Sequence, residues 1–165
     1  MADKAPGKSS SNSLPTRGVV LTRAALVYDL LEPAMMFFRQ RAIVNRTAAG
    51  IGARGGERVL DVGCGTGLVA AAVARGMNHG EVVGIDASLP MIRIARRKRG
   101  SDICRFEAAV AENLPYEDES FDAVVSSLFF HHVAMDLKRR CAGEIVRVLR
   151  PGGRVAVSDL DTPWS

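Results

Sequence analysis

The sequence predicts an α/β protein in which helices flank a parallel β-sheet. Short, valine-rich apolar runs alternate with longer stretches whose apolar residues recur at helical spacing. Glycine, proline and small polar residues separate these stretches. Apolar runs of this kind are typical of strands buried on both faces, and their alternation with helices favours parallel strands joined by right-handed crossovers. A glycine-rich loop directly after the first run places a ligand site at the carboxyl end of a strand.

Five strands and three helices are expected after residue 56. The strands are predicted over residues 58–63, 81–88, 102–110, 121–127 and 154–160. The helices are predicted over residues 67–76, 90–100 and 137–150, and Pro151-Gly152-Gly153 is expected to stop the last of them. Between the third and fourth strands lies only a turn-rich stretch, NLPYEDES.

The chain divides into three parts. Residues 1–18 are rich in Ser, Pro, Gly and Lys and have no hydrophobic periodicity, so we expect a disordered tail. Residues 19–55 are predicted to be a helical segment with breaks near Pro33 and around Asn45. Its Met and Phe side chains belong either to the core or to one wall of a lipophilic pocket. Residues 56–165 hold all the predicted strands and form the core of the fold.

The composition is that of an ordinary globular domain. The chain has 165 residues, of which 47% are hydrophobic and 24% are charged, and its formal charge is +4. Much of the positive charge is local, in Arg93, Arg96, Arg97, Lys98 and Arg99. No aromatic residue is interleaved with this cluster, so we interpret it as a solvated helix face and not as a specific nucleic-acid signal.

The cysteines and the apolar stretches restrict the type of protein further. Cys64, Cys104 and Cys141 are odd in number and form no CxxC pair, which favours neither a zinc site nor a disulfide framework. No metal site is expected. No stretch approaches the roughly 20 apolar residues that cross a bilayer, and the first residues lack a secretory signal. A reducing cytoplasmic location fits these features best.

The glycine-rich loop is the most informative segment. VLDVGCGTG (59–67) carries glycines in the pattern G-x-G-x-G, whereas a dinucleotide fingerprint is G-x-G-x-x-G. A P-loop would also need a Lys-Ser/Thr pair, which is missing here. Asp61 at the end of the strand would repel a pyrophosphate but suits a ligand that bears an ammonium group. The loop therefore disfavours a dinucleotide and a nucleoside triphosphate.

A second carboxylate follows the next predicted strand. Asp86 ends VVGID, nineteen residues beyond Gly67. A carboxylate at this place in an α/β fold can accept hydrogen bonds from both hydroxyls of a ribose. The structural alternative is that Asp86 caps the following helix, a role for which Ser88 competes.

Four motifs together resemble those of class I S-adenosylmethionine-dependent methyltransferases. They are VLDVGCGTG, VVGIDAS, AENLPYEDESFDAVVSS and LRPGGRVAVSD, in compatible order over about residues 56–160. YDLLEP and LPYEDESFD are most similar to the ubiquinone/menaquinone-biosynthesis group. The resemblance implies a Rossmann-like parallel sheet, S-adenosyl-L-methionine as cofactor, and methyl transfer to a small acceptor by in-line displacement. It also implies a binding role for each of these residues: Asp61, Gly63, Gly65, Thr66 and Gly67 at the methionine moiety, Asp86 at the ribose, Ala87, Met91, Ala111 and Glu112 at the adenine, and Ser127 near the methionine end.

One position departs from the family pattern, and the catalytic residues are left open. Val110 stands where relatives often have Asp or Asn, so the adenine contact is either lost or taken over by Glu112. A general base is needed only if the acceptor must lose a proton, and the candidates are His131, His132 and Tyr28. Their structural alternative is a polar turn or a contact with a helix N-terminus. Cys64 could suggest thiol or arsenic chemistry, but a small residue tolerated between two glycines explains it more simply.

The C-terminal end is shorter than the resemblance implies. Family members generally have seven strands, the last two of them at an antiparallel edge, whereas five are predicted here. We expect either a shortened chain or a partner, such as a second copy, that covers the edge of the fifth strand. The functional alternative is accordingly a cofactor-binding module or subunit without methyltransferase activity of its own.

Overall fold

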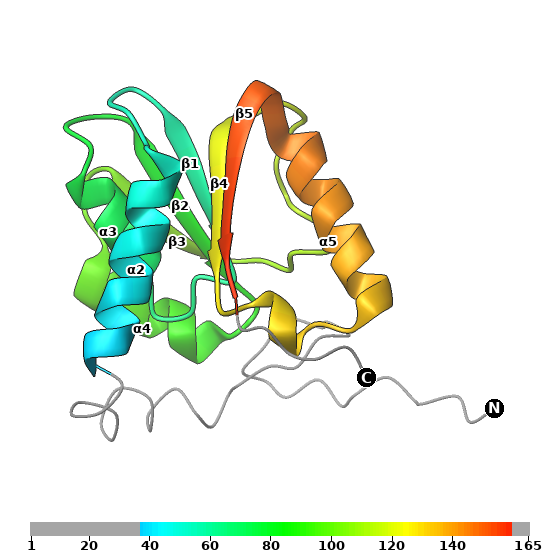
Figure 1. Ribbon diagram of the computed structural model, residues 1–165, viewed down its shortest axis with the longest axis horizontal. Coiled ribbons are helices and arrows are strands. Elements are labelled where there is room, and N and C mark those ends of the chain that lie inside the picture. Colours follow the sequence, from blue (N-terminus) through cyan, green and yellow to red (C-terminus); the bar gives the residue numbers. More distant parts are fainter. Residues whose placement is uncertain (1–36, 160–165) are drawn as a thin grey trace.

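The computed structural model describes residues 37–159, and it describes side chains from residue 41 onward except that of His132 (Figure 1). The predicted tail, Tyr28 and the predicted break at Pro33 therefore lie outside the described residues. The elements in order are α2 (Phe37–Ile51), β1 (Arg58–Val62), α3 (Leu68–Arg75), β2 (Glu81–Asp86), α4 (Leu89–Arg99), β3 (Cys104–Ala108), β4 (Phe121–Ser127), the short 3-10 helix η1 (Phe130–His132), α5 (Met135–Val148) and β5 (Leu149–Ser158).

The five described strands form one parallel sheet, which confirms the predicted fold class. Their order is β3-β2-β1-β4-β5, and every neighbouring pair is parallel. The chain moves outward from β1 to β3 and then returns to pair β4 on the other side of β1. This reversal creates a topological switch point at the carboxyl ends of β1 and β4, which lie at the lower edge of the sheet in Figure 1.

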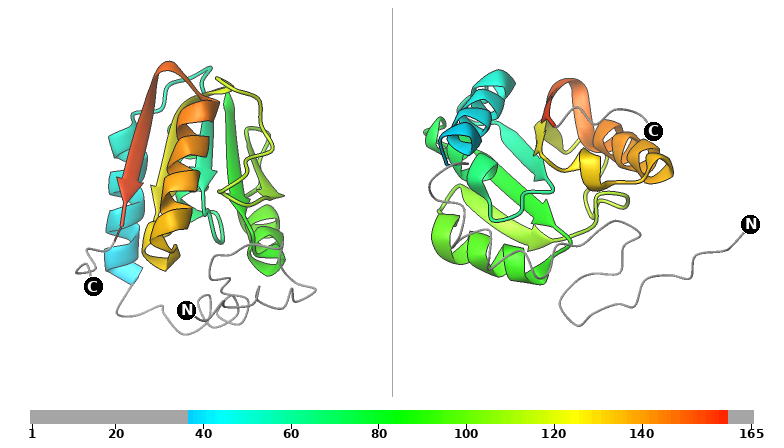
Figure 2. Two further views of the ribbon diagram at one scale, coloured as in Figure 1. Left: turned by 90° about the vertical axis from the view of Figure 1, so that its right-hand side faces the viewer. Right: turned by 60° about the horizontal axis from the view of Figure 1, so that its bottom comes forward.

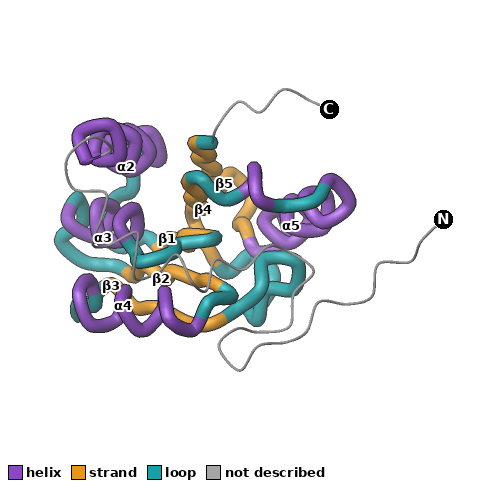
Figure 3. The backbone as a smooth tube through the Cα atoms, turned by 90° about the horizontal axis from the view of Figure 1, so that it is seen from below, coloured by secondary structure: helices purple, strands orange, loops and turns teal. Residues whose placement is uncertain are grey.

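Helices cover both faces of the sheet. Helices α2, α3 and α4 lie on one face and α5 lies on the other, as the view along the strands in Figure 3 and the right-hand view of Figure 2 show. Consecutive strand residues serve opposite faces: Val59 belongs to the core under α3, and Leu60 to the core under α5. Neither side chain is exposed to solvent. Burial of such a side chain contributes about 1.5–3 kcal/mol, so the alternating apolar strands account for the two-sided core.

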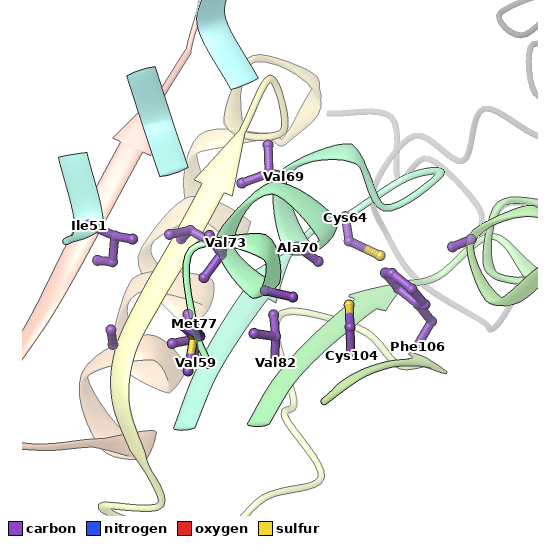
Figure 4. Close-up of a cluster of buried hydrophobic side chains, with 14 of the residues drawn as sticks. Ile51, Val59, Cys64, Val69, Ala70, Val73, Met77, Val82, Cys104 and Phe106 are labelled. Carbon is purple, nitrogen blue, oxygen red and sulfur yellow. The ribbon is translucent and has the colours of Figure 1, made fainter. Parts of the chain in front are cut away.

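The core beneath α3 ends close to the glycine loop. Val73 from α3 and Met77, which follows that helix, meet Val59 and Val82 from the sheet. Cys64, Cys104 and Phe106 lie together at the other end of the cluster (Figure 4). All these side chains are buried. Apolar packing around Cys64 thus fixes the position of the glycine loop on the core.

Two boundary predictions were wrong. Helix α2 passes through Asn45 without a break, because Val44 and Thr47 are buried on its packed face and Thr47 is hydrogen-bonded to the Ile43 carbonyl (2.9 Å) and to the Ser158 hydroxyl (2.8 Å). The last helix ends at Val148, and β5 begins at Leu149, passing through the Pro-Gly-Gly segment that was predicted to separate them. The register of β4 with β5 shifts between Phe121 and Ala123, and a proline can be accommodated at such an irregular sheet edge.

Strand β5 lies at one edge of the described sheet and carries exposed apolar side chains. Among the described residues β5 pairs with β4 only. Val155 and Val157 are 50% and 51% exposed.

No helix among residues 37–159 is both long and apolar enough to cross a bilayer.

Candidate functional site

The glycine loop connects β1 to α3 at the switch point. The Cys64 N–H donates to the Ile85 carbonyl of β2 (2.8 Å), and the Gly67 N–H donates to the Cys64 carbonyl (2.8 Å). Gly65 has a φ of +53° and Gly67 a φ of +87°, in the left-handed region that favours glycine. The loop is therefore a tight turn drawn across the end of β2.

The glycines of the loop differ in what surrounds them. A Cβ on Gly67 would lie 2.5 Å from the Phe106 ring, and one on Gly63 would lie 2.4 Å from the Phe129 ring. Apart from its chain neighbours, a Cβ on Gly65 would meet no atom of the described residues within 4 Å. Gly63 and Gly67 are thus required by packing inside the protein, whereas the backbone of Gly65 faces open space that a ligand can occupy.

Asp86 fastens the loop to the next strand. Its Oδ2 accepts a hydrogen bond from the Gly65 N–H (2.9 Å), and its Oδ1 accepts one from the Ser88 N–H (2.8 Å). Ser88 is the N-cap residue of α4 but makes no side-chain capping bond. Burial raises the pKa of the Asp86 carboxyl, and the two N–H donors oppose that rise. The structural role of Asp86 is therefore to join the loop to the start of α4. From the sequence alone, only helix capping and ribose binding were considered for this residue.

Asp61 lies deeper than the sequence suggests. It is 1% exposed, and its Oδ2 accepts a hydrogen bond from the Ala70 N–H in the first turns of α3 (2.9 Å). Burial raises the pKa of its carboxyl to about 7, and the nearby negative charge of Asp86 contributes in the same direction. Asp61 is thus buried beneath the loop, and its hydrogen bond anchors the first turn of α3.

We expect Asp61→Asn to change how stability depends on pH. Because the folded-state pKa of Asp61 lies above the ordinary value of 3.8, the folded protein holds this proton between about pH 4 and pH 7, and the contribution to stability is lost as the pH rises through that window. An asparagine oxygen can still accept the Ala70 N–H but does not ionise. The free energy of unfolding of Asp61→Asn, relative to the unsubstituted chain, should therefore rise by at most about 4 kcal/mol between pH 4 and pH 7.5.

Urea unfolding of both proteins at several pH values measures this difference directly. Carboxyls with lowered pKa values, such as Glu57 and Asp122, are common to both proteins and cancel in the comparison. Parallel stability curves would show that the carboxyl of Asp61 ionises normally in the folded state.

The remaining predicted residues lie along the same edge of the sheet. Ser127 ends β4, Met91 is buried in α4, and Ala87 lies between β2 and α4. Ala111 is buried and Glu112 half-buried in the segment after β3, whose Ala109 N–H donates to the Asp86 carbonyl (3.2 Å). The carbonyl of Thr66 accepts a hydrogen bond from the Arg99 guanidinium (2.8 Å). The fold thus brings the segments after β1, β2, β3 and β4 to one edge.

The surroundings of Cys64 disfavour thiolate chemistry. Its side chain is buried, and burial together with the charges of Asp61 and Asp86 raises the pKa of the thiol well above its usual range. Cys64, Cys104 and Cys141 are all free and buried. No cluster of residues capable of holding a metal ion occurs within the described part of the chain.

Of the three candidate bases, the structure describes the side chain of His131 only. Its Nδ1 lies 2.5 Å from Oδ1 of Asp159, the residue that follows β5. Sequence reasoning missed Asp159, although an acidic residue at the carboxyl end of a predicted strand next to β4 was a usable signal. It also missed Phe129, whose packing on Gly63 depends on the turn after β4.

One cavity lies away from this edge. It has a volume of about 410 Å³ and lies near the amino ends of the strands. It is lined by residues of α2, of α3 and of the turns that follow them: Asn45, Ala48, Ala49, Gly52, Ala53, Ala72, Val73, Arg75 and Gly76. None of the predicted binding residues lines it.

Comparison with known proteins decides the family. Residues 60–157 match the family model described as "Methyltransferase domain". The chain belongs to this family. The match confirms the resemblance to class I S-adenosylmethionine-dependent methyltransferases that the four sequence motifs indicated, and the sheet order and the glycine loop agree with it.

Individual relatives of this methyltransferase domain agree. It is 38% identical over 139 residues to a demethylmenaquinone methyltransferase of Beutenbergia cavernae, covering 84% of this chain and 55% of the relative. It is 33% identical over 151 residues to a ubiquinone/menaquinone biosynthesis C-methyltransferase of Idiomarina loihiensis, covering 88% of this chain and 59% of the relative. The crystal structure of the YcgJ protein from Bacillus subtilis superposes with a TM-score of 0.65 at 30% identity, over 72% of this chain and 50% of that one. The chain therefore spans a little over half the length of these curated relatives.

Proposed function

We propose that this domain binds S-adenosyl-L-methionine along the carboxyl edge of the sheet and transfers its methyl group to a small, lipophilic acceptor by in-line displacement. The observation that carries the proposal is the junction of Asp86 with Gly65. The Asp86 carboxylate accepts a hydrogen bond from the glycine loop at the switch point. A side chain at Gly65 would point into space that no other described residue fills. Family membership supports the same cofactor.

The residues present fit this cofactor. Each oxygen of a carboxylate can accept two hydrogen bonds, and each Asp86 oxygen accepts one from the backbone. One further acceptor position per oxygen is thus available for the two ribose hydroxyls. The buried hydroxyl of Ser88 has no hydrogen-bond partner among the described residues and lies at the same junction. The methionine moiety would lie over Gly63, Gly65 and Gly67, with Asp61 acting on its ammonium group from behind the loop.

The cofactor supplies a methyl group that is already electrophilic, so the protein must orient the acceptor and exclude water. The Phe129 and Phe130 rings are half-buried and meet edge to face with centroids 5.1 Å apart, and the Phe129 ring lies against Gly63. They supply an apolar wall beside the loop. This wall supports a lipophilic acceptor, as do relatives whose names specify demethylmenaquinone.

Turnover with a reduced demethylmenaquinone tests the activity. We expect the chain, supplied with methyl-labelled S-adenosylmethionine and a short-chain demethylmenaquinol in detergent micelles, to form a methylated quinol. Binding of S-adenosylhomocysteine without transfer to this or any other acceptor in a panel would favour the alternative, a cofactor-binding module. Failure to bind would contradict both.

A partner at the β5 edge is also part of the proposal, and we favour a second copy of the chain. Val155 and Val157 expose about half of their surface along an edge strand whose outer backbone groups face away from β4. An edge of this kind can pair with another strand. We expect sedimentation of the double variant Val155→Lys/Val157→Lys to show a smaller species than the unsubstituted chain, which should be dimeric.

Val146→Lys is the matched control for the edge. Val146 is 71% exposed but lies on α5, so its substitution should leave the assembly unchanged. An unsubstituted chain that sediments as a monomer across a concentration series would contradict the dimer.

A cytoplasmic location is likewise proposed, with support from the three free, buried cysteines.

A further inference from the structure

A histidine and an aspartate from two neighbouring strand ends form a close pair beside the proposed cofactor site. Nδ1 of His131 lies 2.5 Å from Oδ1 of Asp159, and the backbone N–H of His131 donates to Oδ2 of the same carboxylate (3.1 Å). The two side chains are 14% and 17% exposed. The carboxylate therefore holds both the ring and the backbone of one residue.

This arrangement fixes the state of the imidazole. A carboxylate can only accept hydrogen bonds, so the proton of a neutral His131 ring is on Nδ1. The lone pair is then on Nε2, which is the atom that can take up a proton. The same logic orients a histidine base in enzymes in which a carboxylate holds the opposite ring nitrogen.

The pair is anchored at the edge where the glycine loop lies. Ser127 pairs with Ser158 at the ends of β4 and β5, and the Leu128 N–H donates to the Ser158 carbonyl (2.8 Å). Leu128 has a φ of +53°, a left-handed conformation that residues other than glycine rarely adopt. The turn places the Phe129 ring against Gly63 of the loop, and His131 follows two residues later.

We propose that His131, held by Asp159, is the general base that removes a proton from the methyl acceptor. This inference rests on the proposed methyltransferase function. It restricts the acceptor to a protic nucleophile, namely a hydroxyl group or a ring carbon activated by an ionisable hydroxyl. As an electron pair of the acceptor forms the new bond to the methyl carbon, the bond from that carbon to sulfur breaks and leaves a neutral thioether. The acceptor proton passes to Nε2 of His131, which becomes an imidazolium stabilised by Asp159.

His131→Asn separates this role from a merely structural one. An asparagine amide can replace Nδ1 as the donor to Asp159 but has nothing in place of Nε2. The variant should keep its unfolding midpoint and its affinity for S-adenosylhomocysteine. With a short-chain demethylmenaquinol as acceptor, its kcat should fall about 100- to 10,000-fold with little change in KM.

Asp159→Asn tests the positioning role with a readout that does not depend on turnover. In the unsubstituted chain the Nδ1 proton of His131 should give a strongly deshielded NMR resonance, which His131→Asn removes and Asp159→Asn shifts or abolishes. A kcat of the His131→Asn variant within threefold of that of the unsubstituted chain would overturn the base, as would a missing Nδ1 resonance. Absence of any turnover by the unsubstituted chain, with S-adenosylhomocysteine bound, would instead overturn the proposed function and this inference with it.

Discussion

Gly65→Ala should weaken binding of S-adenosylhomocysteine about 100-fold or more while the protein remains folded. The position has a φ of +53°, so an alanine costs about 1–2 kcal/mol of backbone strain. Beyond its two chain neighbours, no residue that the structure describes has an atom within 4 Å of the added Cβ, so we expect no internal clash. The methyl group instead enters the space that we assign to the methionine moiety. Isothermal titration calorimetry gives the change in affinity, and thermal unfolding gives the change in stability.

Gly52→Ala provides a matched control for this experiment. Gly52 follows the end of α2 and has a φ of +56°, and a Cβ built on it likewise has no non-neighbouring atom within 4 Å in the described part of the chain. Its backbone strain should therefore equal that at Gly65, but its position away from the carboxyl edge should leave binding unchanged. Equal affinities of the two variants would contradict the placement of the cofactor over Gly65.

Asp86→Ala should have the second large effect on binding, a loss of about 100- to 1,000-fold. The substitution removes the proposed acceptor for the ribose hydroxyls and also the two backbone bonds that hold Gly65 and Ser88. Hydrogen bonds to a charged group contribute about 1.5–3 kcal/mol each, so losing them displaces the loop as well as the ligand. Asp86→Asn, which keeps one acceptor oxygen, should lie between the two proteins in affinity.

Asp122→Ala distinguishes a local effect from general destabilisation. The Asp122 carboxylate accepts the Arg58 N–H (2.8 Å) and pairs with Arg150 (2.5 Å) near the amino end of β4. It resembles Asp86 in joining two elements but lies at the opposite end of the strands. Its removal should lower the unfolding midpoint and leave the affinity unchanged. If Asp122→Ala weakens binding as much as Asp86→Ala, the effect of Asp86 is on folding alone.

The local parts of the structure could be predicted from the sequence. The apolar runs that became β1 and β2 are buried on both faces, so their residues are apolar at nearly every position and the pattern is unambiguous. The loop glycines and Asp86 are separated by a single βαβ unit, whose geometry fixes where they meet. The fold class and this corner of the candidate site follow from those constraints.

Contacts between distant segments could not be predicted in the same way. The continuity of α2 at Asn45 depends on Thr47 meeting Ser158, a residue at the far end of the sequence. The burial of Asp61 follows from the loop and α3 closing over it. The pairing of His131 with Asp159 depends on the register between β4 and β5. Strand β5 begins at Leu149, earlier than the Pro-Gly-Gly segment implied. A single sequence reports the period of each element but not these registers.

Calorimetric titration of the chain with S-adenosylhomocysteine tests the central claim most directly. The carboxyl edge of the sheet, with Gly65 open and Asp86 joined to the loop, should give saturable binding at one site per chain. The same titration of Gly65→Ala should give little or no binding heat. A folded, unsubstituted chain that shows no saturable binding would contradict the claim that this edge is a cofactor site.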